Sequence, residues 1–308
     1  MNDVVRVFVG SDRSQDLAVD LLAYSIRRHT DLPVEVTSMT SLKLPEPKDV
    51  RQGSRTNFSF TRFAIPALCN YQGRAIYMDA DMQVFKDIEE LWTLPFEGDE
   101  KIQILEEIPE EFQPKEGQVG APKARKKQSS VMLLDCSRLD WVAEDIIAGL
   151  DGDYTYDQLL SDICILEADE IGWRVPWVWN SLETYIPGTT ALTHYTDMYT
   201  QPWASHLNPI GWGWLEEVKR MLADGSLAWE QLEKEVELGH FRPSLLTELR
   251  LNEDLSQSSP ERLAMLEKID TEAGFVKHAE VYRKKRERKK AIAAYEAKLA
   301  AEQAALVS

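Results

Sequence analysis

The sequence predicts an α/β fold built on a mixed, largely parallel sheet, and three segments near its start carry that prediction. Residues 4–10, VVRVFVG, form a β-branched apolar run, as expected for a buried parallel strand. Residues 15–30 place Leu17, Leu21 and Ile26 on one helical stripe, and PVEVTSM then alternates as a second strand. Strand, helix and strand in close succession predict a right-handed crossover, and hence parallel neighbours.

Later segments extend this pattern. Three further strands are expected, in RAIYMDADM, SSVMLLDC and WRVPWVWN, and the segment ALTHYTD follows the last of them. Helices are expected at residues 56–71, capped by Thr56 and interrupted by Pro66, and at residues 139–150 and 156–166. Residues 106–128 are expected to form an irregular insertion, and beyond Trp203 the pattern becomes helical.

Composition limits the classes of function. The chain has 308 residues and 44% apolar content, enough for one large α/β domain and a smaller appendage. Its 35 basic and 52 acidic residues give a net charge of −17, which argues against a nucleic-acid partner, because such binding needs a basic surface.

Cysteine usage and the first residues bear on the compartment. Cys69, Cys136 and Cys164 each lie in an apolar stretch, so we expect three buried thiols in a reducing compartment. The start, MNDVVRVFVG, has neither the apolar region of a signal peptide nor the length of a membrane span. These features predict a cytoplasmic protein.

The strongest chemical signal is Asp79-Ala80-Asp81, which follows the apolar strand residues 75–78. Open α/β sheets bind ligands at the carboxyl ends of their strands. Two carboxylates separated by one residue at such an end can reach one hard cation that also contacts phosphate oxygens. The alternative is a pair of solvated turn aspartates.

The segment from Arg55 to Trp92, RTNFSFTRFAIPALCNYQGRAIYMDADMQVFKDIEELW, resembles the helix, strand, D-x-D and following helix of the family 8 glycosyltransferases. These are retaining enzymes of the GT-A fold, and they include glycogenin and bacterial lipopolysaccharide galactosyltransferases. With the matches described next, the resemblance covers roughly residues 4–205. It implies that Asp79, Ala80 and Asp81 bind the donor diphosphate, the two aspartates through Mn²⁺ or Mg²⁺.

The resemblance also implies a third metal ligand, a histidine in an H-x-x-G-x-x-K-P-W segment. This chain has His194-Tyr195-Thr196-Asp197 followed by Gln201-Pro202-Trp203, with one residue inserted. His194 is therefore the expected third ligand. Asp197 stands where the glycine is usual, and Gln201 stands where a lysine would contact the diphosphate.

Three further residues resemble those around the donor sugar of such enzymes. Arg62 corresponds to a basic residue that contacts the sugar or its diphosphate, where a cation would offset phosphate charge. Asp157 and Gln158 resemble an Asp-Gln pair that faces the reacting carbon of the sugar. The alternatives are a surface salt bridge for Arg62 and a helix cap for Asp157.

The end of the first strand is the expected nucleoside site, with Val9, Gly10, Ser11 and Asp12 as its residues. A small backbone there would allow close approach of the base, although Gly-Ser-Asp is also ordinary turn chemistry. The segment KQSSVMLLDC resembles the N-x-G-V-x-L-x-N strand of the family, with Gln128 and Ser130 in place of Asn and Gly.

Two features of the second half suggest where an acceptor or a membrane could bind. Several of the nine tryptophans lie between Trp173 and Trp214 and could floor an acceptor groove, or could simply pack in the core. The octet RKKRERKK at residues 283–290 opens a segment with Ile292, Tyr295, Leu299 and Leu306 at helical spacing. Such a basic amphipathic helix could contact an inner membrane face, or remain solvated.

The sequence thus predicts a GT-A catalytic domain at residues 1–205 that binds a nucleotide-sugar, and a helical region with a basic tail at residues 206–308. The implied reaction is retaining transfer of a hexose, glucose or galactose, from a UDP-sugar to a carbohydrate or glycolipid acceptor. Two alternatives are a weakened nucleotide-sugar-binding or scaffold protein and a sugar nucleotidyltransferase. The latter usually has a basic Gly-rich loop after its first strand, which Gly10-Ser11-Asp12 matches poorly.

Overall fold

A six-stranded mixed sheet forms the centre of the protein in a computed structural model that describes residues 4–56, 58–106, 109–110, 129–251 and 253–307. The strand order is β2-β1-β3-β6-β5-β7. β1 is parallel to β2 and β3, β5 is parallel to β7, and β6 is antiparallel to both its neighbours. The bounds of the six are β1 Val5–Gly10, β2 Val34–Ser38, β3 Arg74–Asp79, β5 Ile102–Leu105, β6 Val131–Asp135 and β7 Ile171–Val175.

A second, three-stranded sheet has the order β4-β9-β8. Its strands are β4 Met82–Val84, β8 Ser181–Leu182 and β9 Leu192–His194. β4 begins three residues after β3 ends, so this small sheet continues from the carboxyl end of a central strand. The described residues therefore confirm a mixed, mostly parallel α/β architecture.

Helices cover both faces of the central sheet. Phe8 and Tyr77 point to a core shared with α2 and α4, whereas Val7 and Val9 point to a core shared with α1. This alternation follows from the two-residue period of a strand, and it explains why β1 is apolar at every position except Arg6. The helices of this part are α1 Asp16–Arg28, α2 Ile65–Leu68, α3 Glu89–Trp92 and α4 Ala143–Gly149, with short turns η1 Arg13–Gln15, η2 Thr61–Ala64, η4 Gln158–Asp162, η5 Ala168–Glu170 and η6 Trp177–Asn180.

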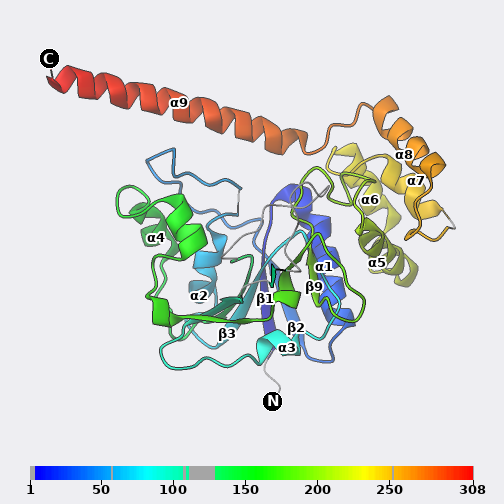
Figure 1. Cartoon of the computed structure of the whole chain (residues 1–308), viewed down its shortest axis with the longest axis horizontal. Helices are drawn as coiled ribbons and strands as arrows, with labels where there is room; N and C mark the ends of the chain where they lie inside the picture. The colour runs from blue at the N-terminus through cyan, green and yellow to red at the C-terminus, as the bar shows by residue number, and fades with distance from the viewer. Residues whose placement is uncertain (1–3, 57, 107–108, 111–128, 252, 308) are drawn as a thin grey trace.

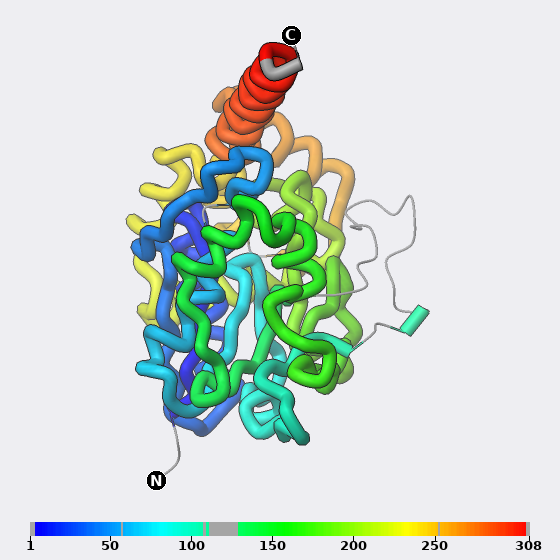
Figure 2. Tube along the Cα trace, turned by 90° about the vertical axis from the view of Figure 1, so that its left-hand side faces the viewer, coloured from blue at the N-terminus to red at the C-terminus, as the bar shows by residue number. Residues whose placement is uncertain are grey.

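The α1 helix joins the sheet to the C-terminal helices. Val19, Leu22 and Ile26 pack on the sheet, while Leu17 and Leu21 enter a separate cluster with Trp203, Trp214 and Phe241. From Gly211 onward every described element is helical: α5 Gly211–Asp224, α6 Trp229–Glu237, α7 Ser244–Arg250, α8 Pro260–Glu272 and α9 Ala279–Val307. Figure 1 shows α5 to α8 grouped beside α1, and α9 crossing the end of the molecule opposite the N-terminus, as Figure 2 also shows.

Several expected boundaries are wrong. The helix expected from Thr56 begins at Thr61 as a tight turn, and Pro66 lies in the first turn of α2, where its missing N–H costs no hydrogen bond. The strand expected across residues 173–180 ends at Val175, because Pro176 cannot donate to the ladder and a helical turn follows. The helix expected at 156–166 is a single wide turn that ends at Ile163, whose φ is 52°.

The prediction of three buried thiols is wrong for one cysteine. Cys69 and Cys136 are buried as expected, but Cys164 is exposed. The side chain of Ile163, whose backbone is left-handed, is buried in the core, and the chain then turns outward so that Cys164 faces solvent. The insertion expected at residues 106–128 lies almost wholly outside the described residues.

A buried ion pair holds the helical region against the segment that follows β9. Arg242 is 1% exposed, and its guanidinium bonds to Glu248, to Ser244 Oγ and to the carbonyl oxygen of Pro202. Its backbone N–H donates to the carbonyl oxygen of Trp203. Arg242 thus fixes the backbone directly after Gln201.

We expect Arg242→Met to lower the free energy of unfolding by about 3 to 5 kcal/mol, because it leaves the Glu248 carboxylate buried without its partner. Chemical denaturation measures this change. The double variant Arg242→Met/Glu248→Met should recover most of the loss. A double variant no more stable than the single one would show that the ion pair is not the source of the effect.

Candidate functional site

The carboxyl ends of β1 and β3 meet at one edge of the sheet, where Gly10 lies opposite Asp79. The chain then turns, and β4 pairs with β9 so that Met82 lies opposite His194. The N–H of Tyr195 donates to the carbonyl oxygen of Asp81 over 2.8 Å. Strand pairing therefore brings His194 beside two aspartates that precede it by more than a hundred residues.

Asp79, Asp81 and His194 form a compact group of candidate metal ligands. One ligand atom from each side chain lies within 4.8 Å of the other two. The side chains are 18%, 15% and 4% exposed, respectively, so the group is largely shielded from solvent. Two carboxylates and an imidazole suit a divalent ion that retains open coordination positions.

The orientation of His194 gives a physical reason to expect a cation in this group. Asn180 donates through Nδ2 to Ser130 Oγ over 2.9 Å, so its Oδ1 faces His194 Nδ1, also at 2.9 Å. This network assigns the ring proton to Nδ1 and leaves the Nε2 lone pair toward Asp81 Oδ1, 3.1 Å away. Two acceptors at that distance repel each other unless a proton or a metal ion lies between them.

Gln201 holds the second aspartate. Its Nε2 donates to Asp81 Oδ2 over 3.0 Å and to the carbonyl oxygen of Tyr195 over 2.9 Å. Both amide hydrogens are therefore used within the protein, and the side chain is 3% exposed. The expected contact of Gln201 with a diphosphate stays a prediction, whereas its bond to Asp81 is part of the structure.

Arg62 and Tyr77 hold the first aspartate. Tyr77 donates its hydroxyl to Asp79 Oδ1 over 2.6 Å, and Arg62 donates to Tyr77 and to the carbonyl oxygen of Ser129. Arg62 Nη2 also lies 3.5 Å from Asp79 Oδ1. Because Arg62 is only 7% exposed, the alternative of a surface salt bridge is wrong. Burial raises the pKa of Asp79, and the charge of Arg62 opposes that rise.

Gly10 provides the space for this network. A β-carbon at Gly10 would lie 2.2 Å from the Tyr77 hydroxyl and 3.0 Å from Phe58. No other residue fits there without moving the hydroxyl that holds Asp79. The expected nucleoside contact of Gly10 stays a prediction.

The neighbours of Gly10 have structural partners of their own. The Val9 side chain is wholly buried in the core, which leaves only its backbone for a ligand. Ser11 Oγ lies 2.6 Å from Thr40 Oγ1 and 3.2 Å from Ser38 Oγ. Asp12 caps η1 by accepting from the N–H of Ser14 over 2.8 Å. Turn chemistry is therefore present at this strand end, and nucleoside binding by these residues stays a prediction.

Asp157 and Gln158 lie on the turn that follows residue 155. The carboxylate of Asp157 is 69% exposed and pairs with Arg55 Nη2 at 2.7 Å. It makes no capping bond to the turn, so the alternative of a helix cap is wrong. Gln158 Oε1 accepts from the N–H and the hydroxyl of Thr155. The catalytic roles expected for the pair stay predictions.

Sequence reasoning missed three residues that hold the site: Tyr77, Asn180 and Glu183. Glu183 has a φ of 46°, accepts from the N–H of Asp197 and from Asn208 Nδ2, and is 7% exposed. Burial raises its pKa to about 7. The available signals were weak, because Tyr77 looks like an ordinary strand residue, and Asn180 is a single polar residue after an apolar run.

Comparisons with known proteins agree with this geometry. The model of glycosyl transferase family 8 matches residues 18–145. Protein CDI of Arabidopsis thaliana is 33% identical over 211 residues, which cover 65% of this chain and 76% of that protein. The chain belongs to glycosyl transferase family 8.

Solved structures of glycosyltransferases resemble this family 8 protein at low sequence identity. GlyE of Streptococcus pneumoniae TIGR4 is 15% identical, with a TM-score of 0.50 over 78% of this chain and 65% of GlyE. The apo structure of the bifunctional glycosyltransferase WbbM matches with 15% identity and a TM-score of 0.49, and this chain spans 52% of its length. LgtC, a galactosyltransferase in complex with donor and acceptor sugar analogs, matches with 14% identity and a TM-score of 0.49 over 76% of this chain and all of LgtC. The similarity to GlyE concerns the fold, and the fold of this family 8 protein is GT-A, as the sequence predicted.

Several tryptophans of this family 8 protein are structural. Trp179, Trp203 and Trp214 are buried, and the last two pack on Phe241. The expectation that such residues floor an acceptor groove is wrong for these three. Trp173 remains 41% exposed.

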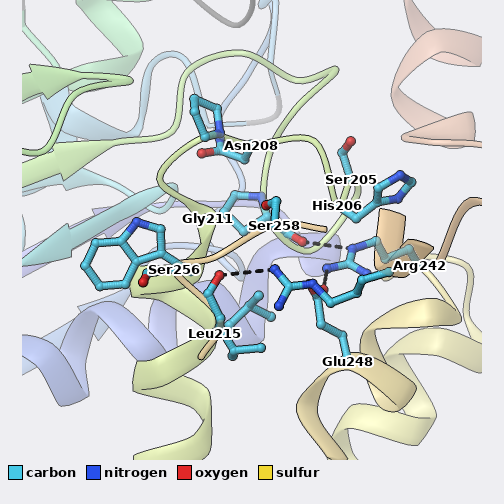
Figure 3. Close-up of a pocket in the computed structure, with 14 residues that line it drawn as sticks. Ser205, His206, Asn208, Gly211, Leu215, Arg242, Glu248, Ser256 and Ser258 are labelled. Atoms are coloured by element: carbon cyan, nitrogen blue, oxygen red, sulfur yellow. Dashed lines mark hydrogen bonds and ion pairs between the residues drawn. The ribbon is translucent and has the colours of Figure 1, made fainter. Parts of the chain in front are cut away.

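A small polar pocket lies between the segment after Trp203 and α7 and α8, away from the metal-ligand group (Figure 3). Figure 3 shows Arg242 and Glu248 converging on it, although the Arg242 hydrogen bonds are already used within the protein. The residues that line it are Pro202, Ser205, His206, Asn208, Pro209, Gly211, Trp212, Leu215, Arg242, Glu248, Leu255, Ser256, Ser258 and Arg262. The pocket belongs to the packing of the helical region.

We expect Asn180→Ala to weaken the binding of a divalent ion about 10- to 100-fold, because His194 loses the acceptor that fixes its tautomer. Titration calorimetry with Mn²⁺ measures the affinity. Thr193→Val is the control, since Thr193 is buried on the same strand but bonds to the carbonyl oxygen of Thr184. Equal affinities in Asn180→Ala and wild type would contradict the assigned orientation of His194.

Glu183 should make the stability of the metal-free protein depend on pH. Its pKa of about 7 in the folded state exceeds the ordinary 4.5, so folding takes up a proton between these values. The stabilisation is complete below about pH 4.5 and is lost as the pH rises through 7. The free energy of unfolding should fall by about 1.4 kcal/mol for each pH unit in that interval, roughly 3 kcal/mol in all.

Denaturation at pH 5.5 and pH 8 tests this expectation. Glu183→Gln should lose most of the difference between the two, while the exposed Glu144→Gln should keep it. An unchanged pH dependence in Glu183→Gln would contradict the role of Glu183.

Proposed function

We propose that this family 8 glycosyltransferase transfers a hexose, glucose or galactose, from a UDP-sugar with retention of configuration and with the help of a divalent metal ion. The observation that carries the proposal is the convergence of Asp79, Asp81 and His194 at the carboxyl edge of the central sheet. That edge is where open α/β sheets bind nucleotides.

The residues present fit a divalent metal ion, Mn²⁺ or Mg²⁺. Asp79 and Asp81 offer hard oxygen ligands, and His194 Nε2 offers a lone pair. When bound, such an ion would neutralise charge on the diphosphate leaving group as a Lewis acid. The lone-pair repulsion between His194 and Asp81 described above supports a cation at this position.

The chain's own residues keep the three ligands in place before any donor arrives. Tyr77 and Arg62 hold Asp79, Gln201 holds Asp81, and Asn180 holds His194. Each holder is at least nine-tenths buried, so little reorganisation is needed on binding. Arg62 would in addition place a fixed positive charge beside the donor diphosphate.

Two routes to retention fit the proposal. In the first, the acceptor hydroxyl attacks from the face that the nucleotide leaves, and its proton passes to the departing phosphate. In the second, the Asp157 carboxylate displaces the nucleoside diphosphate and forms a covalent bond to the sugar, and the acceptor hydroxyl then displaces Asp157 and loses its proton. The pairing of Asp157 with Arg55 and its exposure favour the first route, in which Asp157 and Gln158 would orient sugar hydroxyls.

The remaining partners follow from the same proposal. We assign the catalytic chemistry to residues 1–205, and the acceptor to a carbohydrate or glycolipid. No helix among the described residues has the length and apolar character needed to cross a membrane. Contact of the basic α9 helix with an anionic membrane surface, at the cytoplasmic face, stays a prediction.

The scaffold alternative rested on the substitutions at Gln128, Ser130, Asp197 and Gln201. Gln128 lies outside the described residues. Ser130 bonds to Asn180, Gln201 bonds to Asp81, and the N–H of Asp197 bonds to Glu183. The side chains of Ser130 and Gln201 therefore support the ligand group, whereas Asp197 contributes a backbone N–H that glycine would also offer. The two side-chain contacts favour an active enzyme over a decayed site. Membership of family 8 likewise favours a glycosyltransferase over a nucleotidyltransferase.

A donor screen tests the proposal. Purified protein with Mn²⁺ should release UDP from one member of a panel of UDP- and GDP-sugars, and a chelator should abolish that release. Asp81→Asn should lower turnover by roughly 1,000-fold, since a metal ligand contributes several kcal/mol to the barrier.

The matched control is Asp87→Asn, because the Asp87 side chain only accepts from the N–H of Glu89. Its turnover should equal that of the wild type. Turnover that is indifferent to chelator would remove the metal ion from the mechanism. Tight UDP binding without turnover on any donor would favour the scaffold alternative.

A further inference from the structure

The α9 helix, Ala279–Val307, crosses the end of the molecule opposite the N-terminus (Figure 1). β1 rises from the end of the molecule near the N-terminus in Figure 1, and α9 crosses the opposite end, where β1 and β3 finish. Contacts on two sides of this edge define how the helix is held.

The first side is the segment that follows His194. Lys277 Nζ donates to the carbonyl oxygen of Tyr199 over 3.2 Å and to Ser205 Oγ over 2.9 Å. The Tyr282 ring lies 5.8 Å from the Tyr199 ring. This segment also contains Gln201, which holds Asp81, so the start of α9 is fixed to the backbone that supports a metal ligand.

The second side is the loop that follows β2. Arg288 Nη2 donates to the carbonyl oxygen of Arg51 over 2.8 Å, and the Arg51 guanidinium lies 5.6 Å from the centre of the Tyr295 ring. β2 and β1 are parallel neighbours, so this loop leaves the same edge of the sheet as Gly10. The part of α9 up to Tyr295 therefore bridges two loops that flank the proposed donor site.

The basic residues of α9 differ in their partners. Arg283 and Lys284 pair with Glu280, Arg283 also pairs with Glu287, and Lys298 pairs with Glu302. The other basic residues of the helix have no carboxylate within 4.0 Å in the described part of the chain: Lys285, Arg286, Arg288, Lys289 and Lys290. Lys285 Nζ instead lies 3.6 Å from Met198 Sδ, on the side of the helix that faces the segment after His194.

Among these residues, Lys285 is held beside Met198 and over the Tyr282 ring, on the side of α9 that faces the segment after His194. The carboxylates of the nearby site, Asp79 and Asp81, are assigned to a metal ion and do not pair with Lys285. A bound polyanion would supply the missing counter-charge.

His278 adds a directed hydrogen-bonding group at the same place. Its Nε2 is buried without a hydrogen-bond partner among the described residues, and its φ is 49°, in the left-handed region that is uncommon for residues other than glycine. Burial lowers the pKa of His278, while the carboxylates of Asp12 and Asp81 oppose that change, which places both near the ring. A buried polar atom without a partner and a strained backbone together are typical of ligand sites.

We propose that His278 and Lys285, at the start of α9, bind the diphosphate of the nucleotide-sugar donor. In this proposal α9 covers the donor site at the carboxyl ends of β1 and β3. The inference rests on the proposed function, because it needs a nucleoside diphosphate at the Asp79, Asp81 and His194 group. According to this inference, donor binding needs residues of the helical region in addition to those of residues 1–205. Arg288 holds the helix in position rather than contacting the donor.

The test is the affinity of the full chain for UDP in the presence of Mn²⁺, measured by titration calorimetry for four proteins. They are the wild type, His278→Asn, Lys285→Gln and the control Lys284→Gln. Asparagine tolerates the left-handed conformation at position 278, so the fold should be kept, and thermal melting checks this. Lys284 is adjacent to Lys285 but pairs with Glu280, so the control removes the same charge from another face.

We expect His278→Asn and Lys285→Gln each to weaken UDP binding by about tenfold or more, and Lys284→Gln to bind as the wild type does. The loss should be smaller for UMP, which lacks the second phosphate. Wild-type affinity in both variants would overturn the inference and leave the proposed function intact. Equal losses in all three variants would reduce the effect to general electrostatics and overturn it as well. A wild type that fails to bind UDP with Mn²⁺ would overturn the proposed donor together with this inference.

Discussion

The pairing of β4 with β9 is the constraint on which the candidate site depends. His194 is the last residue of β9, and its side chain faces Asp81 only because Met82 and His194 are direct partners. Successive side chains on a strand point to opposite faces, so a shift of one residue would turn the imidazole away from both aspartates. The small sheet therefore fixes the site, although it has only three short strands.

Around this register, each ligand is held by a buried neighbour that has no direct role in binding an ion. The holders come from distant parts of the chain: Arg62 precedes β3, Asn180 ends η6, and Gln201 follows β9. Arg242 extends this support, because it fixes the backbone directly after Gln201 from the helical region. Arg242 bonds to the backbone of Pro202 and Trp203, and the preceding residue, Gln201, bonds to Asp81. The packing of α5 to α8 thus influences the position of Asp81.

The sequence predicted those features that depend on local pattern. The apolar run before Asp79 and the strand-helix-strand start were enough for the α/β class, and the resemblance added His194 and the GT-A fold. Boundaries failed where tertiary packing or a proline decided the outcome, as at Thr61, Val175 and Cys164. The partners of Asp79, Asp81 and His194 could not be predicted, because no periodicity relates Asn180 to Ser130 or Gln201 to Asp81. Such contacts depend on strand register and on turns, which a single sequence does not encode locally.

The absence of a side chain at Gly10 links two positions that are far apart in the sequence. The Tyr77 hydroxyl occupies the volume that a β-carbon would need, with the aromatic carbon that carries it only 3.0 Å away. Any lineage that acquires alanine at position 10 must also shorten or tilt the residue at position 77, and Asp79 then loses its donor. Homologues should therefore show correlated substitution at these two sites, and a glycine paired with tyrosine would indicate that the aspartate is held in the same way.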